Sequence, residues 1–173
     1  RGVRGWLQGF WHAHIGWAFA PMADGMDRYA GDWRRDRLIR VVSALFPLWA
    51  VLGFVIPTVI GLCASGWQGA VTGFIWGGLV RVLLGHHATW SVNSICHLWG
   101  SKPYASGDES RNNLLVGIVA LGEGWHNNHH AFPSSVRHGL EWWQFDASWI
   151  IIRTMALCGL AWRLRLPSRG ELL

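Results

Sequence analysis

The feature that most constrains this chain is a long stretch without a charged side chain. No residue from Val41 to Ala64 is charged, and about 20 apolar residues are enough to cross the hydrocarbon core of a bilayer. The connection at 65–69 is also uncharged, and a second apolar stretch runs from 70 to about 92, interrupted near its middle by Arg81. The sequence therefore predicts an all-α, multi-pass membrane protein with a transmembrane helical hairpin, its spans at about 41–64 and 70–92.

Composition supports a lipid environment. Hydrophobic residues make up 51% of the chain and charged residues 14%, whereas about a quarter of the residues of a soluble domain are charged. The chain has 14 tryptophans, and indole rings favour the membrane–water interface. The three cysteines, Cys63, Cys96 and Cys158, are far apart and form no CxxC pair, so neither a disulfide framework nor a thiolate metal site is indicated. The expected partner is the lipid bilayer, and no nucleic acid is expected.

The distribution of basic residues predicts an orientation. The segment Arg28–Arg40 before the first span is arginine-rich, and Lys102, Arg111 and Arg137 follow the second span. Because cytoplasmic segments carry an excess of basic residues, both ends of the hairpin should face the cytoplasm. We interpret Arg28–Arg40 as a positive membrane anchor, with the binding of an anionic substrate headgroup as the alternative. Arg81 should face the protein interior or a polar partner, which the sequence does not identify.

A histidine cluster follows in the segment GEGWHNNHHAFP, residues 122–133. Its histidines are His126, His129 and His130. Residues spaced i, i+3 and i+4 share one face of an α-helix, so their nitrogens could converge on one point. Imidazole is the commonest protein ligand for transition metals.

A second group of candidate ligands stands at the end of the second span. Asn93 and His97 are four residues apart and therefore share a helix face, on the same membrane side as the cluster. All-nitrogen ligation suits iron better than magnesium or calcium, although ligand type alone fits zinc as well. We expect a cytoplasmic metal-binding region over about 93–140. A helix over about 140–163 carries charges, so we expect it to lie at the interface rather than to form a third span.

Three segments resemble the integral-membrane acyl desaturases of the stearoyl-CoA (delta-9) type. They are residues 87–97, HATWSVNSICH, residues 122–133, GEGWHNNHHAFP, and residues 137–146, RHGLEWWQFD. The last is similar to the bacterial and cyanobacterial branch of that family. The resemblance extends with less specificity from about 9 to 166, so the chain 1–173 is expected to be the C-terminal part of a membrane desaturase domain in a bacterial inner membrane.

The resemblance implies roles for particular residues. It implies a non-haem centre of two iron ions whose ligands here include His97, His126, His129 and His130. Asn93 would reach a metal through water, and Trp90 would line the acyl tunnel. Glu123, one turn before His126, would either orient an imidazole from the second shell or cap the helix.

The HxxHH of residues 126–130 matches the third histidine box of the family. The first box, HxxxxH, and the second box, a separate HxxHH, are absent from the 173 residues. The numbering is therefore expected to begin just after the second box, so the di-iron centre is incomplete and the fragment inactive alone. The remaining histidines lack a box pattern and are not expected to replace the missing ligands. They are His12, His14, His86, His87 and His138.

The implied reaction inserts a cis double bond, at delta-9, into a saturated fatty acyl chain with O2 and two electrons. The substrate would be a fatty acyl-CoA or an acyl-lipid, and the electron donor cytochrome b5 or ferredoxin with its reductase. Two alternatives remain. A membrane hydroxylase of the same histidine-rich class would form an alcohol, and a non-catalytic membrane protein would bind zinc.

Overall fold

The computed structural model describes residues 2–20, 31 and 33–172. Over these ranges the chain forms helices joined by loops, with two isolated β-bridges and no strand. The prediction of a helical fold is confirmed for this part of the chain. Arg28, the first residue of the predicted basic flank, lies outside the described residues.

The chain divides into two compact units, which are described separately. One comprises Arg1–Ala18 with Gly85–Leu173, and the other Phe19–Leu84. The helices outside the hairpin are α1 (Val3–His14), η1 (Gly16–Phe19), α3 (Arg37–Ala44), η3 (Ile95–His97), α6 (Leu114–Val119), α7 (His126–Ala131) and α8 (Ala147–Leu157).

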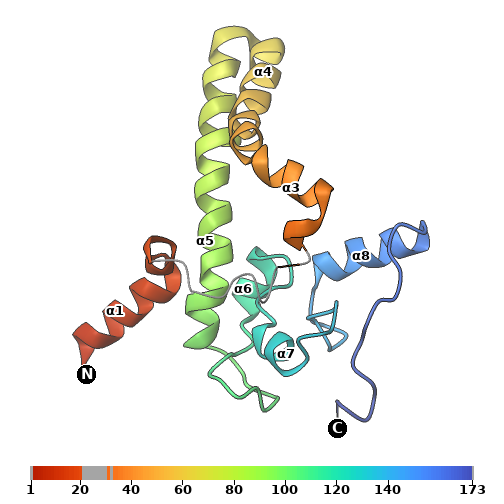
Figure 1. Ribbon diagram of the computed structural model, residues 1–173. Coiled ribbons are helices and arrows are strands. Elements are labelled where there is room, and N and C mark those ends of the chain that lie inside the picture. Colours follow the sequence, from red (N-terminus) through yellow and green to blue (C-terminus); the bar gives the residue numbers. More distant parts are fainter. Residues whose placement is uncertain (1, 21–30, 32, 173) are drawn as a thin grey trace. The chain divides into compact units, whose positions relative to one another are not determined.

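The unit containing the histidine cluster has a small core. Val92 lies at the end of α5 (Arg81–Ser94), and Cys96 lies in η3. Both pack against Val116 of α6, and all three residues are buried. Figure 1 shows α6 and α7 beside this end of α5. The core therefore joins the C-terminal end of the long helix to the segment that leads into α7.

The helix expected over about 140–163 is shorter in the structure. α8 begins after Asp146, whose Oδ1 accepts a hydrogen bond from the backbone N–H of Trp149 at 2.8 Å, and it ends at Leu157. The carboxylate at this position satisfies one of the free N–H groups of the first turn. Asp146 therefore sets the start of the helix inside the predicted window.

In the other unit, α3 and α4 (Phe46–Thr72) meet at Leu45, where the helix is interrupted. Pro47 lies in the first turn of α4, where its missing N–H removes no helical hydrogen bond. The sequence predicted a continuous span from Val41, but the apolar helix begins five residues later, at Phe46, because this proline starts a new helix.

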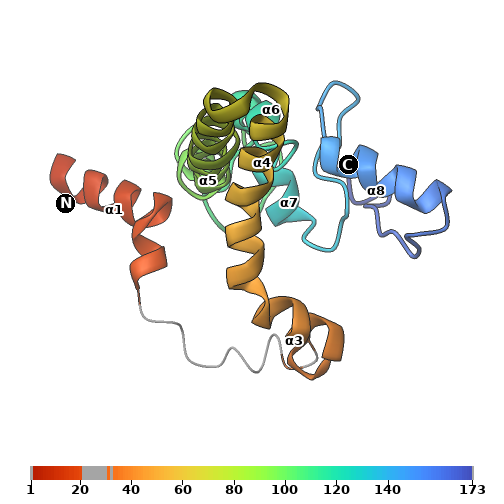
Figure 2. The same ribbon diagram turned by 90° about the horizontal axis from the view of Figure 1, so that it is seen from above.

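α4 is not one straight helix. Ser65 and Gly66 have non-helical backbone angles, with φ of −148° and 62°, and the chain reverses direction there (Figure 1). The second arm continues through the π-helix η2 (Gly73–Val80) into α5, and the arms lie side by side in both views (Figures 1 and 2). Among the described residues, the run Phe46–His97 is the one helical stretch that is long and apolar enough to cross a membrane. The turn divides this run into two antiparallel arms.

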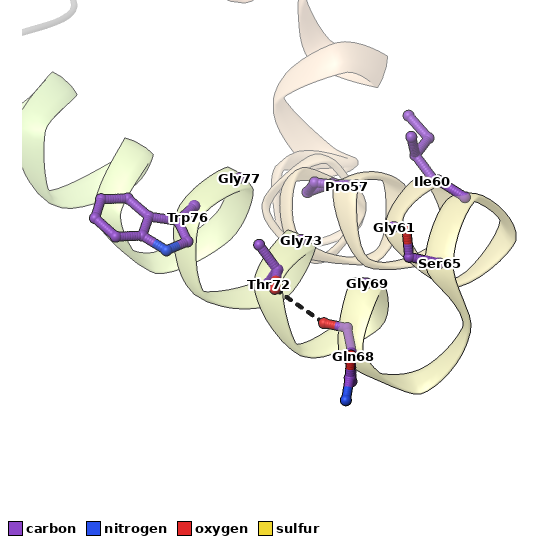
Figure 3. Close-up of a pocket in the computed structure, with 11 residues that line it drawn as sticks. Pro57, Ile60, Gly61, Ser65, Gln68, Gly69, Thr72, Gly73, Trp76 and Gly77 are labelled. Atoms are coloured by element: carbon purple, nitrogen blue, oxygen red, sulfur yellow. Dashed lines mark hydrogen bonds between the residues drawn. The ribbon is translucent and has the colours of Figure 1, made fainter.

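Glycines allow the two arms to approach closely. A Cβ added to Gly61 would lie 2.0 Å from the carbonyl oxygen of Gly69, and one added to Gly69 would lie 2.0 Å from that of Gly61. Figure 3 shows the shallow groove along this contact, where Pro57 of the first arm faces Gly73 and Gly77 of the second. Small residues at such contacts are typical of helices that pack within a membrane.

Arg81 has a partner that the sequence did not identify. Its Nη2 donates to the carbonyl of Gly53 at 3.0 Å, and its Nε donates to the carbonyl of Gly77 at 2.7 Å. Gly53 lies four residues before Pro57, which has no N–H, so the Gly53 carbonyl lacks its usual helical donor. The arginine supplies that donor from the opposite arm and joins the two arms.

We predict that Arg81→Met lowers the free energy of unfolding by about 1.5–3 kcal/mol, since hydrogen bonds to a charged group are lost and a carbonyl is left without a donor. The measurement is unfolding in detergent micelles. Pro57→Ala restores the backbone N–H that donates to the Gly53 carbonyl. Arg81→Met should therefore lower the free energy of unfolding by less in that background. An equal cost in both backgrounds would contradict the proposed pairing.

Candidate metal centre

The candidate centre joins two segments that are far apart in the sequence. His97 lies in η3, and the histidine cluster lies in α7. The N–H of Arg111 donates to the Cys96 carbonyl at 2.7 Å, and the Cys96 thiol contacts the carbonyl of Gly124 at 3.8 Å. These contacts place the start of α7 beside η3.

Gly124 allows the segment before α7 to lie close to the backbone of α6. A Cβ at this position would lie 2.0 Å from the backbone nitrogen of Gly117 in α6. The next residue, Trp125, is 1% exposed, and its Nε1 donates to the Phe145 carbonyl at 2.7 Å. The GEGW sequence before the histidines thus serves packing, and it holds the first turn of α7 against α6.

Three imidazoles meet at one point. Nitrogen atoms of His97, His126 and His130 all lie within 4.8 Å of one another. The Nε2 atoms of His97 and His126 are 3.1 Å apart, and the ring centroids of His126 and His130 are 4.3 Å apart. Two nitrogens bound to a common ion at about 2.1 Å each lie roughly 3 Å apart, so this arrangement fits a transition-metal ion.

His129 lies apart from this trio. Its ring centroid is 6.1 Å from that of His126 and 5.5 Å from that of His130, but 4.5 Å from that of His138, and its nitrogens are not among the three that converge. Its Nδ1 is buried without a hydrogen-bond partner among the described residues. The sequence predicts that all three cluster histidines converge. His129 and His130, at i+3 and i+4 from His126, are however about 100° apart around a helix. The i, i+4 pair therefore meets, while His129 points to one side, and its role as a ligand stays a prediction.

Asn127 attaches α7 to the preceding loop. This side chain is fully buried. Its Oδ1 accepts from the N–H of Tyr104 at 2.9 Å, and its Nδ2 donates to the Tyr104 carbonyl at 3.0 Å and to Ser106 Oγ at 3.1 Å. The asparagine thereby holds the 104–110 loop against the histidine helix.

Asn128 attaches α7 on another side and is 2% exposed. Its Oδ1 accepts from Asn112 Nδ2 at 2.6 Å, and its Nδ2 donates to the His138 carbonyl at 2.8 Å and to Gln144 Oε1 at 2.9 Å. Buried amides that satisfy their hydrogen bonds in this way allow one arrangement of the surrounding chain. The two asparagines between the histidines are therefore anchors of the site.

Asp108 was not among the site residues predicted from the sequence. Its Oδ2 contacts Nδ1 of His130. Hydrogen bonds from Ser110 and Ser106 hold the pKa of the Asp108 carboxyl well below its usual range. The only signal in the sequence was an acidic residue between two serines in a loop, which is common in turns without any metal.

Burial favours the neutral imidazole at His126 and His97. Burial, followed by the charges of His130 and His97, lowers the pKa of His126 to about 3. Burial also lowers the pKa values of His97 and His129. A neutral imidazole can bind a metal ion without first losing a proton.

The other predicted site residues lie around this centre. Asn93 is exposed, one turn before His97. Trp90 is half-buried, with its ring 5.2 Å from that of His87 and 5.8 Å from that of His14. Both residues thus lie in α5, which leads directly into η3 and His97, and their roles stay predictions.

Glu123 is exposed, and its charge acts on His138. Burial lowers the pKa of His138, and the nearby carboxylates of Asp146 and Glu123 oppose this shift. The prediction that Glu123 orients an imidazole or caps the helix is not decided by these contacts.

His14, which the sequence analysis did not count as a ligand, takes part in a separate set of contacts. Its Nδ1 lies 2.8 Å from Ser94 Oγ, and its Nε2 lies 2.9 Å from His87 Nδ1. Both nitrogens are therefore engaged, and the contacts join α1 to α5.

The low pKa of His126 predicts a pH dependence of stability. Between about pH 6.5, the usual value of an unfolded histidine, and about pH 3, the unfolded chain binds a proton here that the folded chain does not. The metal-free protein should therefore lose stability as the pH falls through this window. Thermal unfolding at pH 7.5 and 5 should show a smaller difference for His126→Gln than for the unmodified protein. His12→Gln, on the exposed face of α1, is the control, and an unchanged pH dependence in His126→Gln would contradict the prediction.

Comparison with known proteins supports the interpretation of these motifs. The sequence profile of the fatty acid desaturase family matches residues 1–163. A hex-5-enoyl-(acyl-carrier protein) acetylenase of Moorena producens is 41% identical over 96% of this chain and 52% of its own length. An icosanoyl-CoA 5-desaturase of Limnanthes douglasii is 37% identical over 99% of this chain and 47% of its own.

An sn-1 stearoyl-lipid 9-desaturase of Anabaena variabilis is 36% identical over 95% of this chain and 58% of its own length. The chain thus spans about half the length of the curated relatives that it matches. The family match covers almost the whole chain, including every residue of the candidate centre. The chain belongs to the fatty acid desaturase family.

Proposed function

We propose that the full-length protein inserts a cis double bond into a saturated fatty acyl chain, using O2 and two electrons at a non-haem di-iron centre. The observation that carries this proposal is the convergence of His97, His126 and His130 in a chain of the desaturase family. His129, with its buried free nitrogen, is proposed as a ligand of the second iron. Further ligands would come from segments outside these 173 residues, and a protein without them would be inactive.

The division of labour follows from the substrate. The carbon–hydrogen bonds of a saturated chain have no acidic proton, so acid–base side chains cannot begin the reaction. Bound iron ions would activate O2, which is the oxidant. The residues of this chain hold neutral imidazoles in place, and Trp90 is proposed to line the acyl tunnel. Asn93 is proposed to hold a water molecule beside the metal, and Glu123 to support an imidazole.

The substrate, the position of the double bond and the electron donor are finer proposals. The resemblance to stearoyl-CoA desaturases supports delta-9, while the relatives include 5-, 7- and 9-desaturases named for acyl-CoA or lipid substrates and an acetylenase named for an acyl-carrier protein. We propose an acyl-CoA or acyl-lipid substrate, with electrons from cytochrome b5 or from ferredoxin with its reductase. Gas chromatography of the products identifies the carbon that is oxidised.

We predict that the purified full-length protein holds close to two iron ions per chain and that His97→Ala loses at least half of the iron and nearly all activity. The reason is that His97 contributes one of the three convergent nitrogens. His12→Ala should retain its iron. Zinc without oxygen consumption would instead support a non-catalytic protein, and an alcohol product would support a hydroxylase.

We also propose that the arms of the hairpin cross a bacterial inner membrane and that the histidine centre faces the cytoplasm. The Ser65–Gly66 turn would then lie at the opposite surface. In a Cys63→Ala/Cys158→Ala background, Ser65→Cys should react with a membrane-impermeant maleimide in cells whose outer membrane alone is opened. Glu141→Cys, on the exposed surface of the other unit, should react only after the inner membrane is permeabilised. The reverse pattern would overturn the proposed orientation.

A further inference from the structure

We propose that Asp108 is a positioning residue of the metal centre, holding His130 so that its Nε2 is the nitrogen presented to the metal. This inference rests on the proposed metal-binding function. Asp108 lies outside both the histidine cluster and the segment that carries His97, and it reaches the centre through the 104–110 loop.

The contact selects one nitrogen of His130. Oδ2 of Asp108 is paired with Nδ1 of His130, so a neutral ring carries its proton on Nδ1 and leaves the lone pair of Nε2 free. The His130 ring is 4.3 Å from that of His126 and 5.4 Å from that of His97. A carboxylate on the outer nitrogen fixes both the tautomer and the orientation of an imidazole ligand and strengthens its binding to metal.

The carboxylate is itself held in place. Its Oδ1 accepts hydrogen bonds from the N–H of Ser110 at 2.9 Å and from Ser106 Oγ at 3.0 Å. Ser106 Oγ also accepts from Asn127 Nδ2 at 3.1 Å. The same helix that carries His130 therefore anchors, through Asn127, the loop that presents Asp108.

The neighbouring cationic side chains pair with Glu109 rather than with the Asp108 carboxylate, which contacts His130. Lys102 and Arg111 pair with Glu109, at 3.5 and 3.2 Å. The Glu109 side chain is 71% exposed and forms ion pairs with these two cations, and its charge also acts on His97. Glu109 is therefore a matched control, because it is an adjacent acidic residue that pairs with other groups.

Asp108→Asn keeps one of the two carboxylate oxygens and replaces the other with an amide nitrogen, so the substitution tests their roles separately. The amide can keep its Oδ1 toward Ser110 and Ser106, so the loop retains these hydrogen bonds. The amide nitrogen then faces Nδ1 of His130, and because both are donors in the metal-binding tautomer, the ring must change its tautomer or turn away. Asp108→Glu keeps a carboxylate acceptor and should therefore retain part of the positioning of His130.

The test uses the full-length protein loaded with iron. We expect Asp108→Asn to lose iron to a chelator roughly 10- to 100-fold faster than the unmodified protein, with a changed Mössbauer spectrum. Glu109→Gln should match the unmodified protein, and Asp108→Glu should lie between. Iron retention and a spectrum in Asp108→Asn identical to those of the unmodified protein would overturn the inference.

Failure of the proposed function would give a different result. If the unmodified protein holds no iron, the same comparison is made with Co²⁺, whose visible absorption reports the ligand geometry. A faster loss of Co²⁺ from Asp108→Asn, with an altered absorption band, would still support positioning by Asp108. Equal loss and identical bands in the two proteins would reject it.

Discussion

The hydrogen bonds of Asn127 and Asn128 are the interactions on which the histidine centre depends. α7 has only six residues and no side-chain cap, and a helix of that length is not stable by itself. The two buried amides attach it to the 104–110 loop and to the segment around His138. The position of the imidazoles is thus determined by side chains that do not belong to the histidine trio.

In the hairpin, too, a side-chain hydrogen bond joins separate segments. Pro57 removes a backbone N–H from the first arm, and Arg81 of the second arm donates to the carbonyl left free. In an apolar environment an unsatisfied carbonyl is costly, so the proline and the arginine are best understood as a pair. Each of them would be unfavourable in such a segment without the other.

Much of the fold could be predicted because it is encoded locally. The uncharged stretch from Val41 predicted the first arm, and the second apolar stretch after the short connection at 65–69 predicted the hairpin. The start of the helix was misplaced because Pro47 could be accommodated either inside a span or in a first turn. The predicted convergence of His126, His129 and His130 rests on helical periodicity alone, and the structure brings together His126 and His130 of the three.

The contacts between distant segments could not be predicted in this way. Periodicity places His129 on the same general face as its neighbours, but only the packed structure shows that its ring lies beside His138. Asp108 carries no motif, and its role depends on the path of a loop held by Asn127. By itself the sequence determined the hairpin and the i, i+4 pair of imidazoles, because both follow from spacing along one helix. The family resemblance implied that His97 joins that pair, and the tertiary structure alone decided that Asp108 does, because such contacts depend on how buried amides and a small core bring separate segments together.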